Sequence, residues 1–205
     1  LTQNEIKSFR QKEGLFEKFR QLLEKFDISK EDAVDEIVSY AKLYADTFKA
    51  GMLDDAIIRY NGVERLAYLM YTQDFWTPVP YILYILKNVE SKRERDNIFS
   101  YIETYLMRRL ICKSKNNSYS DMFSENLIGQ GVNTFETFKA YVNDSVARGT
   151  LLMPSDEDVL EAVKHNDLKR DAQVILYMLE SRLNEAFSTS SHDNCFNIFV
   201  KEQIM

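Results

Sequence analysis

The chain has 205 residues, of which 45% are hydrophobic and 28% charged, as in a soluble globular protein with a substantial core. Its 6 Gly and 3 Pro favour helices over sheets, because strands need more turn residues. The net charge of −6 argues against a stand-alone protein that binds nucleic acid by charge, and no apolar run approaches the length of a membrane span.

Apolar residues recur at helical spacing through the first half of the chain. They predict a helix over residues 4–26, with a weak point at Gly14, and a second helix after Ser29, which begins a capping-box-like SKED. Residues 51–89 predict three short helices, with breaks near 61–62 and 77–80. The last of these is apolar nearly all round, so we expect it deep in the core.

The second half predicts further helices. SKRE at 91–94 is a capping box that opens a helix to about residue 112, and later helices are expected from Asn117 to Gly129 and over 134–148. PSDED at 154–158 starts another helix, and Asn166 or Asp167 caps a final long one. We therefore predict an all-α fold, a single domain of about eight or nine helices, with a possible short strand at 195–200.

The ends of the chain predict a fragment of a longer protein. The sequence starts at Leu1 and stops at VKEQIM without a polar tail. We expect one helical domain over 1–205, with residues 186–205 as a linker into a further domain. The cysteines Cys112 and Cys195 lack any paired spacing, so free thiols in a reducing cytoplasm are expected.

No set of residues predicts a catalytic, cofactor or metal site. His165 and His192 stand far from any cysteine, and GQG at 129–131 lacks the rest of a phosphate loop. The acidic cluster at 156–161 has the chemistry to bind a cation, but it more simply complements the positive end of a helix. Cys112 has no histidine near it in sequence, so a buried structural cysteine is expected.

The charge is uneven along the chain, and one segment is basic. Residues 87–115 hold eight Lys or Arg against four Asp or Glu, whereas 116–205 hold seven against fourteen. Solvated helix charges are the simpler interpretation, and a contact face is the alternative.

An arginine pair interrupts the apolar stripe of the predicted helix over 91–112. At 100° per residue, Arg109 falls in the middle of the stripe and Arg108 at its border, so Arg109 should point inward. A buried guanidinium needs partners, and the favoured hypothesis is that Arg109 joins several helix ends through its five donors. The alternative is a phosphate contact across a cleft, with Arg108, Lys113 and Lys115 around it.

The stretch around this pair resembles a known family. YIETYLMRRLICKSKNNSYSDMF (101–123) is similar to the signature YL-x-RR-x-IC-(basic, polar turn)-NY-x-K-x-F of GmrSD-type modification-dependent (type IV) restriction nucleases. The sequence departs from the signature at Lys113, where Gly is common, at Ser118, where Asn is usual, and at Asp121, where Lys is usual. PSDEDVLEAVKHNDLKR and VILYMLESRLNE also resemble family helices, so the likeness covers roughly residues 90–185. The matching residues are Tyr105, Leu106, Arg108, Arg109, Ile111, Cys112, Tyr119 and Phe123.

The resemblance implies a helical middle domain without chemistry of its own. In the family, a ParB-like domain with an Asp-Gly-Gln-Gln-Arg motif uses a nucleotide, and a metal-dependent HNH-type domain opens with Glu-His-Ile-x-Pro-Gln. Neither motif is complete here. The last four residues resemble the start of the HNH motif with Gln203 in place of His. That alignment implies a domain border and a degenerate nuclease site, whereas without it Gln203 carries no information about activity.

Three hypotheses follow for function. The leading one is a non-catalytic scaffold in a bacterial defence nuclease that acts on DNA and depends on a nucleotide and a divalent metal bound by its other domains. The second is a module that binds DNA backbone or protein, and it predicts one exposed positive patch of Arg93, Arg95, Lys113 and Lys115. The third is an enzyme with an unrecognised site, and it predicts a deep polar pocket near Cys112 and Arg109.

Overall fold

Serine and threonine caps decide where four of the helices begin. The computed structural model describes residues 14–49, 51, 62–144 and 151–187. The hydroxyls of Ser29, Ser91, Thr134 and Ser155 each accept a hydrogen bond from the backbone N–H three residues later, which satisfies a donor that the first helical turn leaves open. The starts predicted at Ser29, Ser91 and Ser155 are therefore confirmed.

The described residues form nine helical segments and no strand, which confirms the all-α prediction. Three short elements, α6, η4 and α7, join into one continuous segment with a π-helical turn in its middle. The predicted strand at 195–200 and the linker beyond residue 187 lie outside the described residues. The elements are α1 (Leu15–Lys25), α2 (Lys30–Thr47), α3 (Gly62–Gln73), α4 (Val79–Asn88), α5 (Lys92–Ile111), α6 (Tyr119–Asp121), η4 (Met122–Asn126), α7 (Leu127–Gly129), α8 (Phe135–Asn143), α10 (Asp156–His165) and α11 (Ala172–Phe187).

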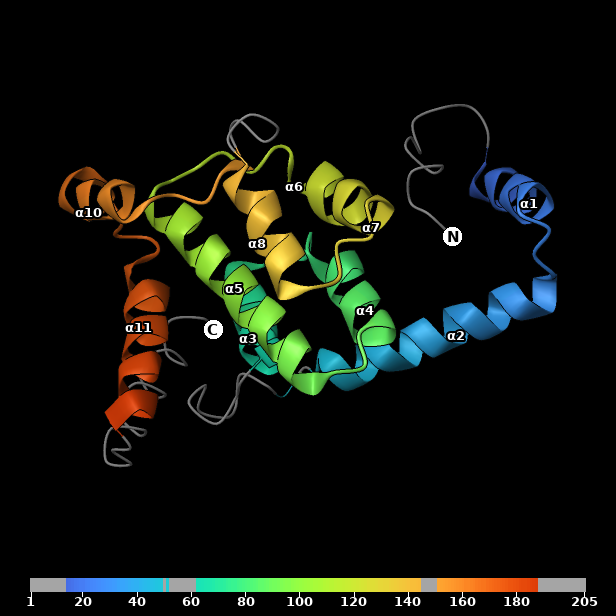
Figure 1. Cartoon of the computed structure of the whole chain (residues 1–205), viewed down its shortest axis with the longest axis horizontal. Helices are drawn as coiled ribbons and strands as arrows, with labels where there is room; N and C mark the ends of the chain where they lie inside the picture. The colour runs from blue at the N-terminus through green and yellow to red at the C-terminus, as the bar shows by residue number, and fades with distance from the viewer. Residues whose placement is uncertain (1–13, 50, 52–61, 145–150, 188–205) are drawn as a thin grey trace.

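The long helix α5 is the centre of the arrangement (Figure 1). It packs against α3, α8, α4 and α10, and α3 makes its most extensive contact. Helices α1 and α2 extend from this body as an arm, while α10 and α11 lie at the opposite side (Figure 1). We use "body" below for α3 to α8. The final helix begins at Ala172, because Asn166 ends α10 instead of capping α11.

The core of the body is aromatic and aliphatic. Ile98, Ile102 and Tyr105 of α5 are completely buried, as are Tyr81 and Ile82 of α4. The prediction that α4 lies deep in the core is thus confirmed. The rings of α4, η4 and α8 meet at centroid separations of 5.8 to 6.2 Å, which is the range of favourable aromatic pairs.

Helix α2 carries the apolar side that its spacing predicts, but that side faces solvent. Val34 and Ile37 are 56% and 50% exposed, and Val38 and Tyr44 are also exposed. The helix contacts α4 through its middle, where Ser39 and Tyr40 meet Lys87. It also contacts the body at its end, where Phe48 is buried and its carbonyl accepts a hydrogen bond from the Tyr71 hydroxyl.

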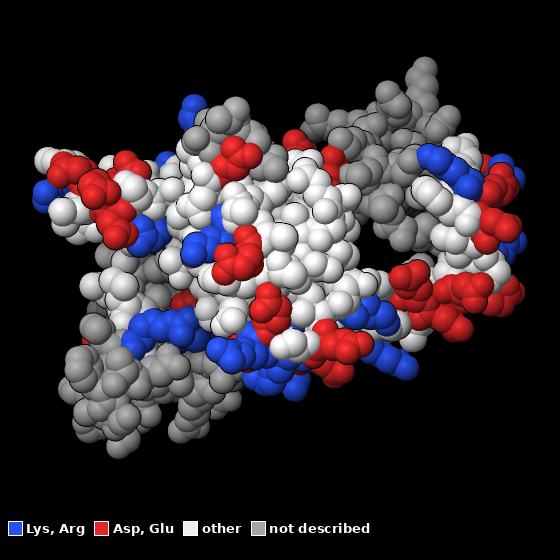
Figure 2. Space-filling view, viewed as in Figure 1, with Lys and Arg blue, Asp and Glu red and all other residues white. Residues whose placement is uncertain are grey.

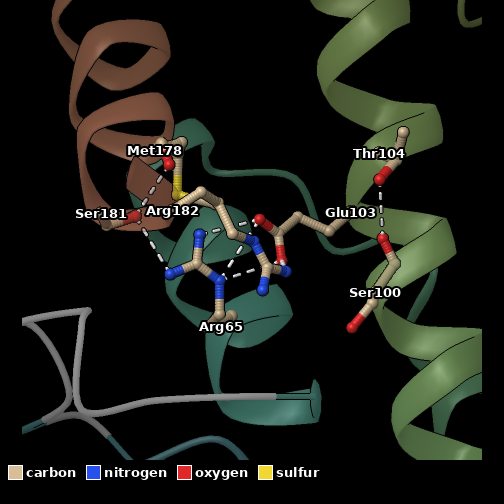
Figure 3. A network of polar contacts seen from close by, with 7 residues as sticks. All are labelled: Arg65, Ser100, Glu103, Thr104, Met178, Ser181 and Arg182. Carbon is tan, nitrogen blue, oxygen red and sulfur yellow. Dashed lines mark hydrogen bonds and ion pairs between the residues drawn. The ribbon is translucent and has the colours of Figure 1, made fainter. Parts of the chain in front are cut away.

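A buried ion-pair network that no local sequence pattern predicts joins three helices (Figure 3). Arg65 of α3 donates to both carboxylate oxygens of Glu103 on α5, at 2.9 to 3.3 Å, and to the hydroxyl of Ser181 on α11. Arg182 of α11 donates to the same carboxylate at 2.7 Å. Arg65 is 1% exposed and Glu103 5%. One carboxylate therefore fastens α11 to the body.

We predict that Glu103→Gln lowers the free energy of unfolding by about 3–5 kcal/mol, since two guanidinium groups lose the negative charge that compensates them. Urea unfolding followed by circular dichroism measures this. Glu90→Gln, at an exposed residue outside any helix, is the control and should change it by less than about 0.5 kcal/mol. Equal effects from the two substitutions would contradict a central role for Glu103.

Candidate functional site

The end of α5 has a hydrogen-bond pattern that turns the chain back over the helix. The N–H of Lys113 donates to the Leu110 carbonyl at 3.1 Å, and the N–H of Ser114 donates to the Arg109 carbonyl at 2.9 Å. This is a Schellman motif, in which the residue after the cap adopts a left-handed conformation that glycine prefers. Here Lys113 occupies that position with φ of 50°. The backbone conformation costs a non-glycine residue roughly 1 kcal/mol.

Arg109 points inward, as the helical wheel predicts, and its side chain is 2% exposed. Its Nε donates to the Tyr119 hydroxyl at 2.5 Å. Its two terminal nitrogens donate to the carbonyls of Lys115, at 2.5 Å, and of Leu152, at 3.1 Å. The guanidinium therefore joins α5 to the turn after it, to α6 and to the segment before α10. The favoured hypothesis named several helix ends as its partners, whereas the structure gives it a tyrosine hydroxyl and the carbonyls of a turn and a loop.

The residues that carry the family resemblance pack around this guanidinium. It lies over the rings of Tyr105 and Tyr119, at 5.4 and 5.1 Å from their centroids. The Tyr105 hydroxyl donates to the Leu151 carbonyl at 2.8 Å, and the ring of Phe123 lies 5.8 Å from that of Tyr119. A cation close to aromatic rings is stabilised by the ring quadrupoles. The spacing of the signature thus has a packing explanation.

Arg108 lies at the border of the apolar stripe of α5 and binds the start of α10. It donates to the Pro154 carbonyl at 3.0 Å and forms an ion pair with Asp156. The acidic cluster of α10 also has structural partners, because the Asp158 carboxylate accepts hydrogen bonds from Ser155, which lower its pKa. The cluster therefore serves the N-terminus of α10 and the attachment of that helix to α5.

The four residues of the predicted positive patch do not lie together. Arg93 and Arg95 are in the first turn of α5, whereas Lys113 and Lys115 follow its end, about 30 Å away for a 20-residue helix. Arg95 donates to the Val89 carbonyl, and Lys113 donates to the Asp167 carbonyl. Figure 2 shows Lys and Arg mixed with Asp and Glu along the lower edge of the body and over α1, and mainly acidic groups over α2. The prediction of one patch is wrong.

A cleft opens beside Arg109, at the place where the third hypothesis expects a pocket. It has a volume of about 450 Å³ and lies between α3, the end of α5, α6 and the start of α11. Its lining joins an apolar floor to polar and charged side chains. The residues are Leu69, Gln73, Phe75, Leu106, Arg109, Leu110, Lys113, Ser114, Asn116, Tyr119, Arg170 and Asp171.

The residues that line the cleft include no cysteine and no histidine. Cys112 is half-buried and does not line it, and burial, together with Asp158, raises the pKa of its thiol. His165 is exposed on α10 and lies 3.2 Å from Glu161. Within the described ranges, no group of three or more His, Cys, Asp or Glu has the arrangement of a metal site. His192 and Cys195 lie outside those ranges.

We predict that the two arginines differ sharply in their effect on stability. Arg109→Ala leaves buried carbonyls without donors and opens a cavity, so it should lower the free energy of unfolding by about 3 kcal/mol or more. Arg108→Ala removes a partly exposed ion pair and one hydrogen bond, so about 1 kcal/mol is expected. Thermal and urea unfolding measure both. Similar losses would contradict the contrast between the two positions.

The buried tyrosines predict a loss of stability at high pH. Burial raises the pKa of Tyr81, Tyr105 and Tyr119 above the ordinary value of 10.0, although Arg109 partly opposes this at Tyr119. Their neutral forms are favoured in the folded state, so their contribution is complete below pH 10 and is lost as the pH rises above it. Absorbance of tyrosinate and circular dichroism should therefore change together above pH 10. Ionisation of all 12 tyrosines with unchanged ellipticity would contradict this.

Comparisons with protein-family models, with curated proteins and with solved structures found no match to this chain. No helix in the described part is long and apolar enough to cross a membrane. The geometry of the chain and the resemblance of residues 90–185 are therefore the basis for a function.

Proposed function

We propose that this chain is a non-catalytic helical scaffold that holds the flanking domains of a DNA-acting, restriction-like defence protein. The partners would be a ParB-like domain on one side and a nuclease-like domain on the other, and any nucleotide or metal would belong to them. The single observation that carries the proposal is the distribution of exposed apolar side chains.

The exposed large apolar side chains are confined to the two ends of the fold. In the part of the chain that the structure describes, each one lies on the arm or on α10 and α11, and the body between them exposes none. Figure 1 places these two sets of helices on opposite sides of α5. An extended apolar surface on a folded protein marks a contact with another protein surface. The exposed large apolar residues are Phe26, Val34, Ile37, Val38, Tyr44, Leu160, Val163, Leu176 and Leu179.

On the arm, the apolar face of α2 continues into a groove. Ile37 and Tyr40 line it from α2, Leu83 and Tyr84 from α4, and Ile128 from α7, and its volume is about 640 Å³. A groove with apolar walls beside an exposed helix face suits the packing of a helix or loop from a neighbouring domain. Because α2 carries five Asp or Glu against two Lys (Figure 2), the partner surface should carry basic residues at its rim.

On the other side, α10 and α11 each present a pair of apolar residues one turn apart. Leu160 and Val163 share a face of α10, and Leu176 and Leu179 share a face of α11. All four are more than half exposed. Helix α11 is also fastened to the body by Glu103, so a domain that docks on it would be held rigidly against α5.

The contacts around Arg109 support an architectural function for the family signature. Tyr105, Arg109 and Tyr119 hold the segments after α5 together, and Lys113 keeps the backbone conformation of the glycine that the signature commonly has. Arg108 is engaged within the fold by the Pro154 carbonyl and by Asp156. These contacts favour a scaffold over the alternative module that binds DNA backbone.

The first test separates the two docking faces from the stability of the chain itself. Leu176→Glu with Leu179→Glu, and Ile37→Glu with Val38→Glu, should change the unfolding free energy of this chain little, since the side chains are already exposed. In the full-length protein the same pairs should lower protease resistance and restriction activity. Lys139→Glu with Ala140→Glu, at exposed positions of α8, is the matched control. Unchanged resistance and activity would remove the scaffold proposal.

The second test measures DNA binding by this chain alone. Fluorescence anisotropy with a labelled duplex, across a salt series, should show no micromolar binding, because the cations of 87–115 are scattered and mixed with acids. Micromolar binding that weakens with salt and with Arg108→Ala, Lys113→Ala and Lys115→Ala would favour the alternative instead.

A further inference from the structure

We propose that the cleft beside Arg109 binds a small amphipathic anion, a phosphate or carboxylate joined to an apolar or aromatic group. This inference is independent of the scaffold proposal, because it concerns a concave site on the body and not the apolar faces at its ends. Its volume of about 450 Å³ lies in the range of small-molecule sites.

The lining divides into an apolar floor and a positive wall. Leu69, Phe75 and Leu106 supply the floor, and the ring of Phe75 lies 5.4 Å from that of Tyr119. The wall carries the cations Arg109, Lys113 and Arg170 against one carboxylate, Asp171, so positive charge is in excess. An anionic group with an apolar body satisfies both surfaces at once, whereas a bare anion leaves the floor exposed and a neutral apolar ligand leaves the cations unused.

Two side chains at the mouth of the cleft have capacity for a ligand. Arg170 makes no hydrogen bond or ion pair within the described part of the chain, and its planar guanidinium matches the oxygens of a carboxylate or phosphate. Asn116 adds an amide, which also makes no side-chain hydrogen bond there. Both lie on irregular segments next to a rigid helix end, the usual place of binding residues.

Lys113 is the residue that connects the fold to this site. Its backbone is left-handed, which glycine adopts without strain, and yet it carries an ammonium group that lines the cleft. The ammonium donates to the neutral carbonyl of Asp167, a contact that positions the group and leaves its charge available to an anion. Its position at the mouth of the cleft is thus set by the helix end.

The test is titration of the folded chain with phenyl phosphate, followed by NMR chemical shifts and isothermal calorimetry. We expect saturable binding that weakens with salt, with shifts confined to the cleft. Inorganic phosphate and phenol, each carrying half of the ligand, should bind at least about tenfold more weakly. Benzoate in place of phenyl phosphate distinguishes a carboxylate from a phosphate source. Absence of saturation, or equal affinity for inorganic phosphate, would overturn the proposal.

Variants keep this test independent of folding. Arg170→Gln and Lys113→Gly should each weaken binding about tenfold or more, since each removes one charge-assisted contact. Lys113→Gly also relieves the left-handed strain, so its thermal stability should not fall enough to explain a loss of affinity. Lys169→Gln, one residue from Arg170 but outside the lining, is the matched control and should bind as the wild type does. Equal weakening in all three would overturn the proposal.

Discussion

The rest of this structure depends on one buried cation at the end of its central helix. Arg109 lies at the point where α5 stops, and its donors meet the turn that follows, the first residue of α6 and the segment that leads to α10. These segments have little regular structure of their own, so their backbone carbonyls need donors from elsewhere. A guanidinium suits this task because its donors lie in one plane and point in different directions. The neighbouring rings of Tyr105 and Tyr119 shield it from water and stabilise its charge.

The chain compensates its buried charges with two different kinds of partner. At Arg109 the observed partners are carbonyl and phenol oxygens, whereas at Arg65 the partner is the carboxylate of Glu103. The first arrangement fixes irregular backbone, which presents carbonyls but no carboxylates. The second fixes whole helices, because side chains from α3, α5 and α11 converge on a single group. Together they place specific polar links at the end and at the middle of α5, where apolar packing alone would let neighbouring helices slide.

Local sequence signals predicted the elements and the inward arginine, because both depend on near neighbours in the chain. Caps such as Ser91 and the 100° spacing of α5 are such signals, and Arg109 stood out because its stripe was otherwise apolar. No local sequence signal predicted the buried network around Glu103. Its partners are 38 and 79 residues away, so only the tertiary structure reveals the network. The basic patch failed for a related reason, since charges close in sequence are separated by the full length of one helix. The apolar side of α2 was visible in the sequence, but the spacing does not show whether the chain itself covers it.

Lys113 shows how an architectural position and a binding position can coincide. The turn after α5 contains a left-handed residue, so that the chain can return over Arg109, and Lys113, Ser114 and Asn116 of this segment line the cleft. Glycine would complete the turn with less strain, but it would leave the wall of the cleft with one cation fewer. The lysine therefore adds a function that the turn does not require. A scaffold held rigid by Arg109 and Glu103 would keep such a site in fixed geometry, and a preformed site binds a small anion without the entropic cost of ordering its own loops.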